Sequence, residues 1–433
     1  MMQISGRDSG IGEEKIMGKT IPQIDLSVMP ENTPGHLQYL YELNTVDDRL
    51  GYLGHPDSVL LKNGDILTVY PEGHGHGKTC ARVSRDGGKT YEPYLEKEPE
   101  SWKYSLETPT IYRLEFTEHD WSDKLILISG QPLWEDPSVV SSGGFDCSLS
   151  SDEGKTWTEY EHFYRKGDTV WFYTTVAMSS LTKLKENGKF VDRWMGLFHT
   201  GDEFVNYKTI LTFDEEGHMH WSCPEPYFQK YRAIEKFSHM CEVECIRSDG
   251  GQGDELLLLT RSNTKNINSL ISISTDEGKT WSEPVEAPDA VNGERHKADY
   301  LPDGRLFITF RAIDRDSEKV AWYHPGQGYV CEGWTAWIGS YDDLKYGRSG
   351  DFRIKIAHTY LPEQQKPDVE ANWDTGYCGN VVLPDGTVVT SSYGVFSPEE
   401  KKDGFYDTPR GRFTRKTYVA SKRIRIEDVE SLI

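Results

Sequence analysis

Three short segments decide the fold: SRDGGKTY at Ser84–Tyr91, SSDEGKTW at Ser150–Trp157 and STDEGKTW at Ser274–Trp281. All three fit the pattern S-x-D-x-G-x-T-aromatic, which we call the box. The first two box aspartates are 66 residues apart, and the second and third are 124 apart, which is twice 62. A degenerate copy is therefore expected near position 214, and TFDEEG at Thr212–Gly217, followed by Trp221, has this form.

The chemistry of the box is structural. An aspartate in a tight turn accepts hydrogen bonds from backbone N–H groups, and a glycine supplies the positive φ angle that such turns require. The threonine and the aromatic residue fix the hairpin on its sheet. We interpret the box as scaffold rather than as a catalytic motif.

A second recurring pattern predicts β-hairpins. Asn63-Gly64, Asp303-Gly304 and Asp385-Gly386 each separate two short apolar runs, which is the strongest local hairpin signal. Four-stranded units at regular spacing form the blades of a propeller. The sequence predicts an all-β fold, a six-bladed β-propeller, with seven blades as the alternative and with blades that open near these residues: His55, Thr108, Met178, Glu242, His296 and Tyr377.

The whole chain, residues 1–433, is expected to form one propeller domain. Residues 1–50 are an N-terminal extension, and together with the final strand, Tyr418–Ile426, this extension is expected to complete one blade and close the ring. Helical periodicity is weak throughout the sequence.

Composition excludes several classes of partner. The formal net charge is −22 and the isoelectric point is about 5.1, so we expect no binding to nucleic acid or to anionic membranes. No apolar run approaches the length of a membrane span. Met1–Gln23 has no stretch of signal-peptide type, and the seven cysteines form an odd set without a CxxC pair, so a cytoplasmic location is expected. No cofactor is expected.

The box, the hairpin pattern and the segment TGYCGN at Thr375–Asn380 together resemble the sialidase (neuraminidase) superfamily, from about Leu53 to the end of the chain. Sialidases use an arginine triad for the substrate carboxylate, a Tyr–Glu nucleophilic pair and an aspartic acid. A tyrosine nucleophile is an exception among retaining glycosidases. By position, the resemblance implies the following residues: Tyr377 as nucleophile, Glu242 or Glu244 as its partner, and Arg261 and Arg311 as arginines of the triad.

The first blade departs from the family pattern. Gly54-His55-Pro56 stands where the family has Arg-Ile-Pro, so the first triad arginine is missing. The next loop, EGHGHGK at Glu72–Lys78, offers His74 and His76 in place of the acidic residue. These histidines could be a general acid or base, a metal-ligand pair that lacks an identified third ligand, or part of a surface loop without a role. Weak or absent release of sialic acid is expected.

Three candidate residues share a position within their blades. His55, Arg295 and Tyr377 each lie nine residues before a hairpin glycine, so we expect them to converge at one mouth of the central channel. The alternative is that Tyr377 only packs there. Arg261 and Arg311 end interior strands, where they either pair with Glu242 and Glu244 or face an anion. His296 adds potential positive charge at the same mouth.

The leading hypothesis is an exo-acting glycoside hydrolase that cleaves a terminal, acidic sugar from an oligosaccharide or glycoconjugate. Tyr377 and Glu242 would form the nucleophilic pair, His74 or His76 the acid, and Arg261, Arg295 and Arg311 the anion site, with His55, Glu244 and His296 as further substrate-binding residues. One alternative is a polysaccharide lyase that uses a His/Tyr pair. The other is a glycan-binding propeller without catalysis.

Overall fold

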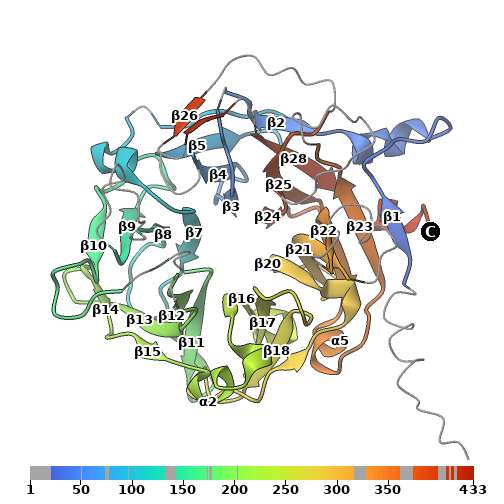
Figure 1. The fold of residues 1–433 in the computed structure, drawn as a ribbon. Coiled ribbons are helices and arrows are strands. Elements are labelled where there is room, and N and C mark those ends of the chain that lie inside the picture. Colours follow the sequence, from blue (N-terminus) through green and yellow to red (C-terminus); the bar gives the residue numbers. More distant parts are fainter. Residues whose placement is uncertain are drawn as a thin grey trace, which may run out of the picture.

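The computed structural model describes the following residues: 21–49, 51–73, 78–95, 97–131, 143–172, 174, 178–201, 203–315, 328–360, 374–397, 406–408, 411–413 and 417–433. In this part of the chain, six sheets of four or five strands stand around a central axis as the blades of a propeller (Figure 1). The predicted all-β, six-bladed fold is confirmed. No described helix is long and apolar enough to span a membrane.

The first three blades follow each other along the chain. Blade 1 contains β3 (Asp57–Leu60), β4 (Ile66–Pro71), β5 (Thr79–Ser84) and β6 (Glu92–Pro93). Blade 2 contains β7 (Thr110–Leu114), β8 (Lys124–Gly130), β9 (Phe145–Ser150) and β10 (Glu161–Phe163). Blade 3 contains β11 (Ser180–Glu186), β12 (Lys189–His199), β13 (Asn206–Phe213) and β14 (Met219–Trp221), with β15 (Glu225–Pro226) also paired to β13.

Of the other three blades, blades 5 and 6 each include a strand from the N-terminal part of the chain. Blade 4 contains β16 (Met240–Arg247), β17 (Leu256–Ser262), β18 (Leu270–Ser274) and β19 (Val285–Glu286). Blade 5 contains β20 (Gly293–Tyr300), β21 (Leu306–Asp314), β22 (Val330–Gly339) and β23 (Phe352–Ala357), and β1 (Gln23–Asp25) joins it parallel to β23. Blade 6 contains β24 (Gly379–Val382), β25 (Val388–Gly394), β28 (Tyr418–Ile424) and β2 (Asn44–Asp47).

The remaining elements are short. A two-stranded sheet is formed by β26 (Tyr406–Thr408) and β27 (Gly411–Phe413). The helical segments are η1 (Gly35–Tyr41), η2 (Glu100–Tyr104), η3 (Glu235–Phe237), η4 (Asp289–Val291), α2 (Gln229–Arg232), α3 (Ser248–Gly251), α5 (Tyr341–Lys345) and α6 (Ile426–Glu430). They connect or cover strands and form no layer of their own.

The antiparallel order of each blade defines two rims. The first strand starts, and the second strand ends, at what we call the upper rim. The boxes follow third strands, as after Ser84 and Ser274, so they lie at the opposite, lower rim. Residues that begin a first strand or end a second strand, such as Glu242 and Arg261, therefore share the upper rim.

The boxes hold the lower rim through their aspartates. Asp86 accepts hydrogen bonds from the N–H groups of Lys89 (3.0 Å) and Thr90 (2.9 Å) and from the Thr90 hydroxyl (2.6 Å). The box glycine Gly88 has φ +87°, and a Cβ there would lie 2.5 Å from Cγ1 of Val389 in the adjacent blade 6. Only glycine allows both this backbone conformation and this close approach between blades.

The hydrophobic core is divided among the interfaces between neighbouring blades. One buried cluster joins blades 3 and 4 and includes Met195, Leu258 and Trp281. Comparable clusters lie between the other blade pairs. Since each blade is covered by its two neighbours, the ring as a whole replaces a single central core.

Backbone N–H groups on the axial edge of the innermost strands donate hydrogen bonds to side chains of the preceding blade. Asp57 accepts from the N–H of Ile111 (3.0 Å), and Glu244 accepts from the N–H of Ala298 (3.1 Å). Uncovered strand edges are otherwise prone to pair with other chains. Polar side chains that line the axis therefore already have a structural role, which is to bind the backbone of the next blade.

Candidate active site

A β-bulge at the upper rim positions Glu242. Met240 pairs with Ser262 and Val243 pairs with Thr260, so two residues of β16 lie opposite the single residue Arg261 of β17. Bulges bend a strand and redirect its side chains. The bulge explains how the glutamate and the arginine of adjacent strands can both face the axis.

Glu242, Arg261 and Tyr377 form one hydrogen-bonded group. The Tyr377 hydroxyl donates to Glu242 Oε1 (2.6 Å). Arg261 Nη1 donates to Glu242 Oε2 (2.7 Å) and to the Tyr377 oxygen (2.7 Å). Glu242 and Arg261 come from blade 4, and Tyr377 precedes the first strand of blade 6. Of the two glutamates that the sequence offers as partner of Tyr377, the structure places Glu242 in contact.

The electrostatics keep the tyrosine protonated and the glutamate ionised. Burial raises the pKa of Tyr377 well above its usual value, the Glu242 carboxylate adds to this, and Arg261 and Arg311 oppose it. Burial alone would also raise the pKa of Glu242. However, Arg261, Arg295 and the Tyr377 hydroxyl outweigh burial, so the pKa of Glu242 is lowered. A neutral phenol thus donates a hydrogen bond to an ionised carboxylate.

A second carboxylate, Glu294, joins the cations of the upper rim. Its Oε1 lies 3.0 Å from Arg261 Nη2 and 3.1 Å from Lys265 Nζ, and its Oε2 lies 3.1 Å from Arg311 Nη1. Burial would raise the pKa of Glu294, but these cations lower it to about 2. Arg311 therefore pairs with Glu294, not with Glu244, and its guanidinium also lies 5.0 Å from the centre of the Tyr377 ring.

His55 and Arg295 occupy equivalent places in blades 1 and 5. Both have a positive φ angle, +45° and +51°, just before or within the first strand. The His55 ring lies 4.8 Å from the Tyr377 ring, and its Nε2 is 3.1 Å from the Tyr393 hydroxyl. Arg295 is buried, and its Nη1 has no hydrogen-bond partner among the described residues. Bulky residues with positive φ are strained, and such strain is often found at functional sites.

Two other predicted residues are held by the backbone. Glu244 accepts the Ala298 N–H as described above, and burial raises its pKa to about 7. His296 donates from Nε2 to the Val291 carbonyl (2.9 Å), and burial lowers its pKa to about 4, so the ring is neutral at pH 7. Neither contacts the Tyr377 hydroxyl. His74 and His76 lie outside the described residues.

Sequence reasoning missed Glu294, His199 and Phe204. Glu294 opens blade 5 much as Glu242 opens blade 4, so the recurring blade start could have indicated it. His199 is the last residue of β12; it is buried, and its Nδ1 has no partner in the described part of the chain. Phe204 has φ +53° and stacks on His199, with 5.9 Å between ring centres. The centre of the His239 ring lies 5.2 Å from that of Phe204.

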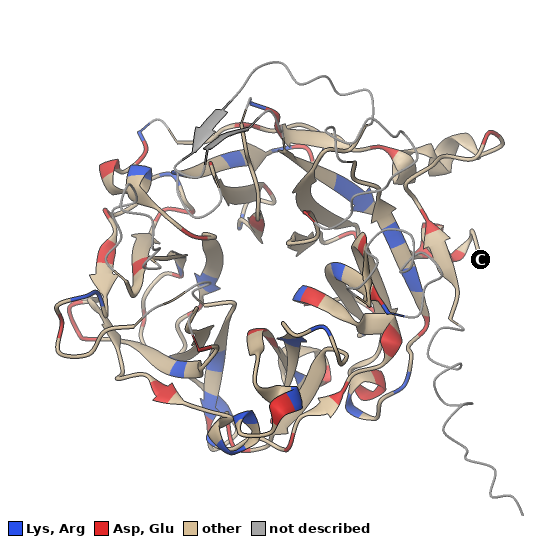
Figure 2. Cartoon of the chain, in the orientation of Figure 1, with Lys and Arg blue, Asp and Glu red and all other residues tan. Residues whose placement is uncertain are grey.

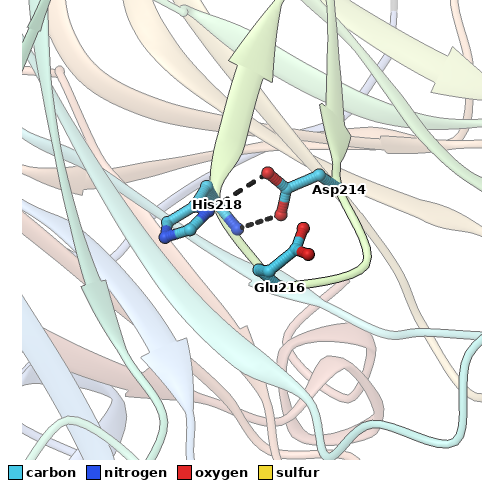
Figure 3. Close-up of side chains that lie close together, drawn as sticks. All are labelled: Asp214, Glu216 and His218. Carbon is cyan, nitrogen blue, oxygen red and sulfur yellow. Dashed lines mark hydrogen bonds and ion pairs between the residues drawn. The ribbon is translucent and has the colours of Figure 1, made fainter.

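Charged residues of both signs lie on the strands around the axis as well as on the outer surface (Figure 2). One exposed group, Asp214, Glu216 and His218, brings three side chains within metal-binding distance of one another (Figure 3). It lies in the degenerate box, where Asp214 accepts from the backbone N–H of His218 (2.9 Å). Thr90, Thr156 and Thr280 donate in the same way in the intact boxes. The hydrogen bonds of a box turn therefore explain why these side chains lie close together.

The comparisons with known proteins agree with this fold. Residues 116–329 match the model of the BNR repeat-like domain. An intramolecular trans-sialidase from Ruminococcus gnavus superposes with a TM-score of 0.52 at 11% identity, over 88% of this chain and 96% of its own. The chain thus has the sialidase-like propeller fold, and its residues 116–329 are similar to the BNR repeat-like domain. No curated protein sequence matches it.

This sialidase-like propeller also resembles structures outside the sialidases. An α-L-arabinofuranosidase from Fusarium graminearum, solved with arabinobiose, superposes with a TM-score of 0.53 at 10% identity, over 89% of this chain and 97% of its own. A protein of unknown function from Dyadobacter fermentans gives 0.55 at 17% identity, over 88% of this chain and 98% of its own. At these identities the likeness establishes the fold alone.

Proposed function

We propose that the protein is an exo-acting glycoside hydrolase that releases a terminal sugar, with Tyr377 as nucleophile and Glu242 as its base. The observation that carries the proposal is the hydrogen-bonded group of Tyr377, Glu242 and Arg261 at the upper rim. A buried tyrosine with a carboxylate 2.6 Å from its hydroxyl and a guanidinium 2.7 Å away has what a phenolic nucleophile requires.

In the first step the Tyr377 oxygen attacks the anomeric carbon while its proton passes to Glu242. The bond from the anomeric carbon to the leaving oxygen breaks, and an acid protonates that oxygen. Arg261 stabilises the negative charge that develops on the phenol oxygen and holds Glu242 in place. In the second step water attacks the anomeric carbon of the glycosyl–tyrosine and gives a proton to the group that acted as the acid. The bond from the anomeric carbon to the Tyr377 oxygen breaks, and Glu242 returns the proton to Tyr377. The configuration of the sugar is retained.

We assign the acid to His74 or His76, the role that the sequence suggests for them. The related folds support a sugar substrate, since both the trans-sialidase and the arabinofuranosidase act on glycosides by name. The acidic sugar expected from the sequence depended on free arginines, and Arg261 and Arg311 are ion-paired with Glu294.

Covalent trapping tests the proposal. Oligosaccharides and aryl glycosides would first be screened to find the sugar released, and the matching 2-fluoro glycosyl fluoride would then be incubated with the enzyme. Mass spectrometry of the digested protein should locate the sugar on Tyr377, and Tyr377→Phe should remain unlabelled. Label on another residue would reject the nucleophile. Formation of an unsaturated product that absorbs in the ultraviolet would favour the lyase, and binding without turnover would favour a glycan-binding protein.

A further inference from the structure

The cations at the upper rim already hold a carboxylate, and it belongs to the protein. Glu294 is fully buried, and its two oxygens bridge Arg261 and Arg311 at 3.0 and 3.1 Å, with Lys265 at 3.1 Å. Two guanidinium groups that converge on one carboxylate are the usual arrangement for recognising an anionic ligand. Here that position is filled from within the fold.

Both Nη atoms of Arg261 already face acceptors of the protein. Nη1 donates to Glu242 and Tyr377, and Nη2 donates to Asn263 (2.7 Å) and forms an ion pair with Glu294. A guanidinium carries two N–H groups on each Nη atom, so three of the four donate hydrogen bonds, and Nη2 also serves the ion pair. A substrate carboxylate could bind here only by displacing Glu294, which would leave a buried negative charge without its partners.

Two groups that remain available near Glu242 suit hydroxyls. The Nη1 of Arg295 and the Nδ1 of His199 are both buried and without hydrogen-bond partners among the described residues. His199 ends the second strand of blade 3 and Arg295 lies near the start of the first strand of blade 5, so both belong to the upper rim on either side of Glu242 in blade 4. Burial lowers the pKa of His199 to about 4, so its ring is neutral and can accept from, or donate to, a hydroxyl. Arg295 can only donate, and a neutral sugar oxygen can accept from it.

We propose that Glu294 permanently occupies the anion position between Arg261 and Arg311 and that the terminal sugar is uncharged. The substrate class is a neutral glycoside, with its hydroxyls bound by Arg295 and His199, rather than a sialoside or uronide. This inference rests on the proposed glycosidase function. It makes Glu294 a specificity-determining residue that does not itself touch the substrate.

A panel of 4-methylumbelliferyl glycosides tests the substrate class directly. Neutral glycosides, α-L-arabinofuranoside among them, should be cleaved with kcat/KM about 100-fold or more above that for the glucuronide and the sialoside. One bidentate contact to a substrate carboxylate would give a factor of about this size in the opposite direction. A preference for an acidic glycoside would overturn the inference but keep the glycosidase. No cleavage of any oligosaccharide or aryl glycoside would reject the proposed function itself.

A second measurement does not depend on turnover. In Glu294→Ala the two arginines lose their carboxylate, so sodium acetate should raise the melting temperature of the variant well above the effect of equimolar sodium chloride. The wild-type protein should show no difference between the salts. The matched control is Glu277→Ala, which removes a carboxylate from Arg247 at the lower rim and should not alter the preference between neutral and acidic glycosides.

If Glu294→Ala does not fold, Glu294→Ser opens the same space with a short polar side chain and serves in the same assay. It should gain weak binding of acetate and of free sialic acid, measured by calorimetry, that the wild-type protein lacks. Binding of either carboxylate to the wild-type protein with the same affinity would show that the anion position is open, and the inference would then be wrong.

Discussion

The hydroxyl of Tyr377 is the atom on which the proposed chemistry depends. Tyr377→Phe should lower kcat by about 1,000-fold or more, because removal of a nucleophile abolishes the covalent route. The same change should lower the free energy of unfolding by only about 1–2 kcal/mol, since Glu242 keeps its bond to Arg261. Kinetics on the best glycoside and urea denaturation measure the two effects. Loss of stability alone, with turnover preserved, would assign Tyr377 a packing role.

The ionisation of Glu242 predicts the acid side of the pH profile. Its carboxylate must be ionised to accept the tyrosine proton, and its pKa lies below the ordinary value of 4.5. Protonation of Glu242 should therefore lower kcat/KM only below about pH 4.5. Glu242→Gln should reduce turnover by about 100- to 10,000-fold and remove this decline from the residual activity. A pH–rate profile in which Glu242→Gln keeps the same acid limb would contradict the assignment.

Lys422 predicts an unusual dependence of stability on pH. It is buried in β28, its Nζ donates to the carbonyls of Leu26 and Ile356 (both 2.7 Å), and burial lowers its pKa from 10.5 to about 7. Between these two values the unfolded chain binds more protons than the folded one, so the contribution to stability rises as the pH increases from 7 to 10.5 and is lost as the pH falls.

Replacement by a residue that does not titrate isolates this effect. The difference in unfolding free energy between wild type and Lys422→Met should change in favour of wild type from pH 7 to pH 9.5. Urea denaturation at each pH measures it, and the variant cancels the contributions of other titrating groups. A constant difference over this range would mean that Lys422 is not titrating as its burial requires.

The sequence predicts the site residues whose positions follow the blade repeat, but not those whose positions depend on a local irregularity in a strand. Tyr377 and Arg261 stand at fixed distances from hairpins and strand ends, so their rim could be predicted. The pairing of Arg311 with Glu294 could not, because a bulge in β20 decides where Glu294 points. A one-residue bulge reverses the alternation of side chains, and the residue pattern carries no clear signal for it.

At the scale of elements, two boxes bind neighbouring blades together by the same contacts. Glu277 accepts from Arg247 Nη1 and Nη2 (both 2.7 Å) of its own blade and from the backbone N–H of Lys185 (2.9 Å) in the preceding one. In the same way, Glu153 binds Arg113 and the N–H of Lys62. The regular spacing of boxes predicted the blades, but these links between blades become visible only in three dimensions.

Removal of one such link should be strongly destabilising. Glu277→Ala leaves the Arg247 guanidinium, whose side chain is 5% exposed, without its carboxylate, so the free energy of unfolding should fall by about 3 kcal/mol. Glu92→Ala breaks an exposed pair with Arg85 and should cost less than about 1 kcal/mol. Chemical denaturation compares the two variants. Equal effects would mean that the box glutamate is not a link between blades.

At the scale of the whole molecule, blade 6 joins the two ends of the chain. Its outer strands are β28 and β2, and Asn44 pairs with Ser421 across the ring closure. A chain that ends at Phe413 lacks β28, so β2 loses its partner, β25 keeps only β24, and cooperative unfolding should disappear. A chain that ends at Arg425 keeps β28 and should still unfold cooperatively, at a lower temperature because Ile426 and Val429 leave the core. Calorimetry distinguishes the two, and a full cooperative transition in the shorter chain would contradict this prediction.

The pairing of β2 with β28 also delays the closure of the ring while the chain is being translated. The two strands are separated by more than 370 residues, so β2 leaves the ribosome about 20–75 s before β28 at 5–20 residues per second. During that time blades 1 to 5 can form one after another, each covering its predecessor, while β2 and the open side of blade 1 stay uncovered. Long-range strand pairing is slow and exposes edges to aggregation. Chaperones that shield strand edges should therefore raise the yield of the folded protein most when translation is slow.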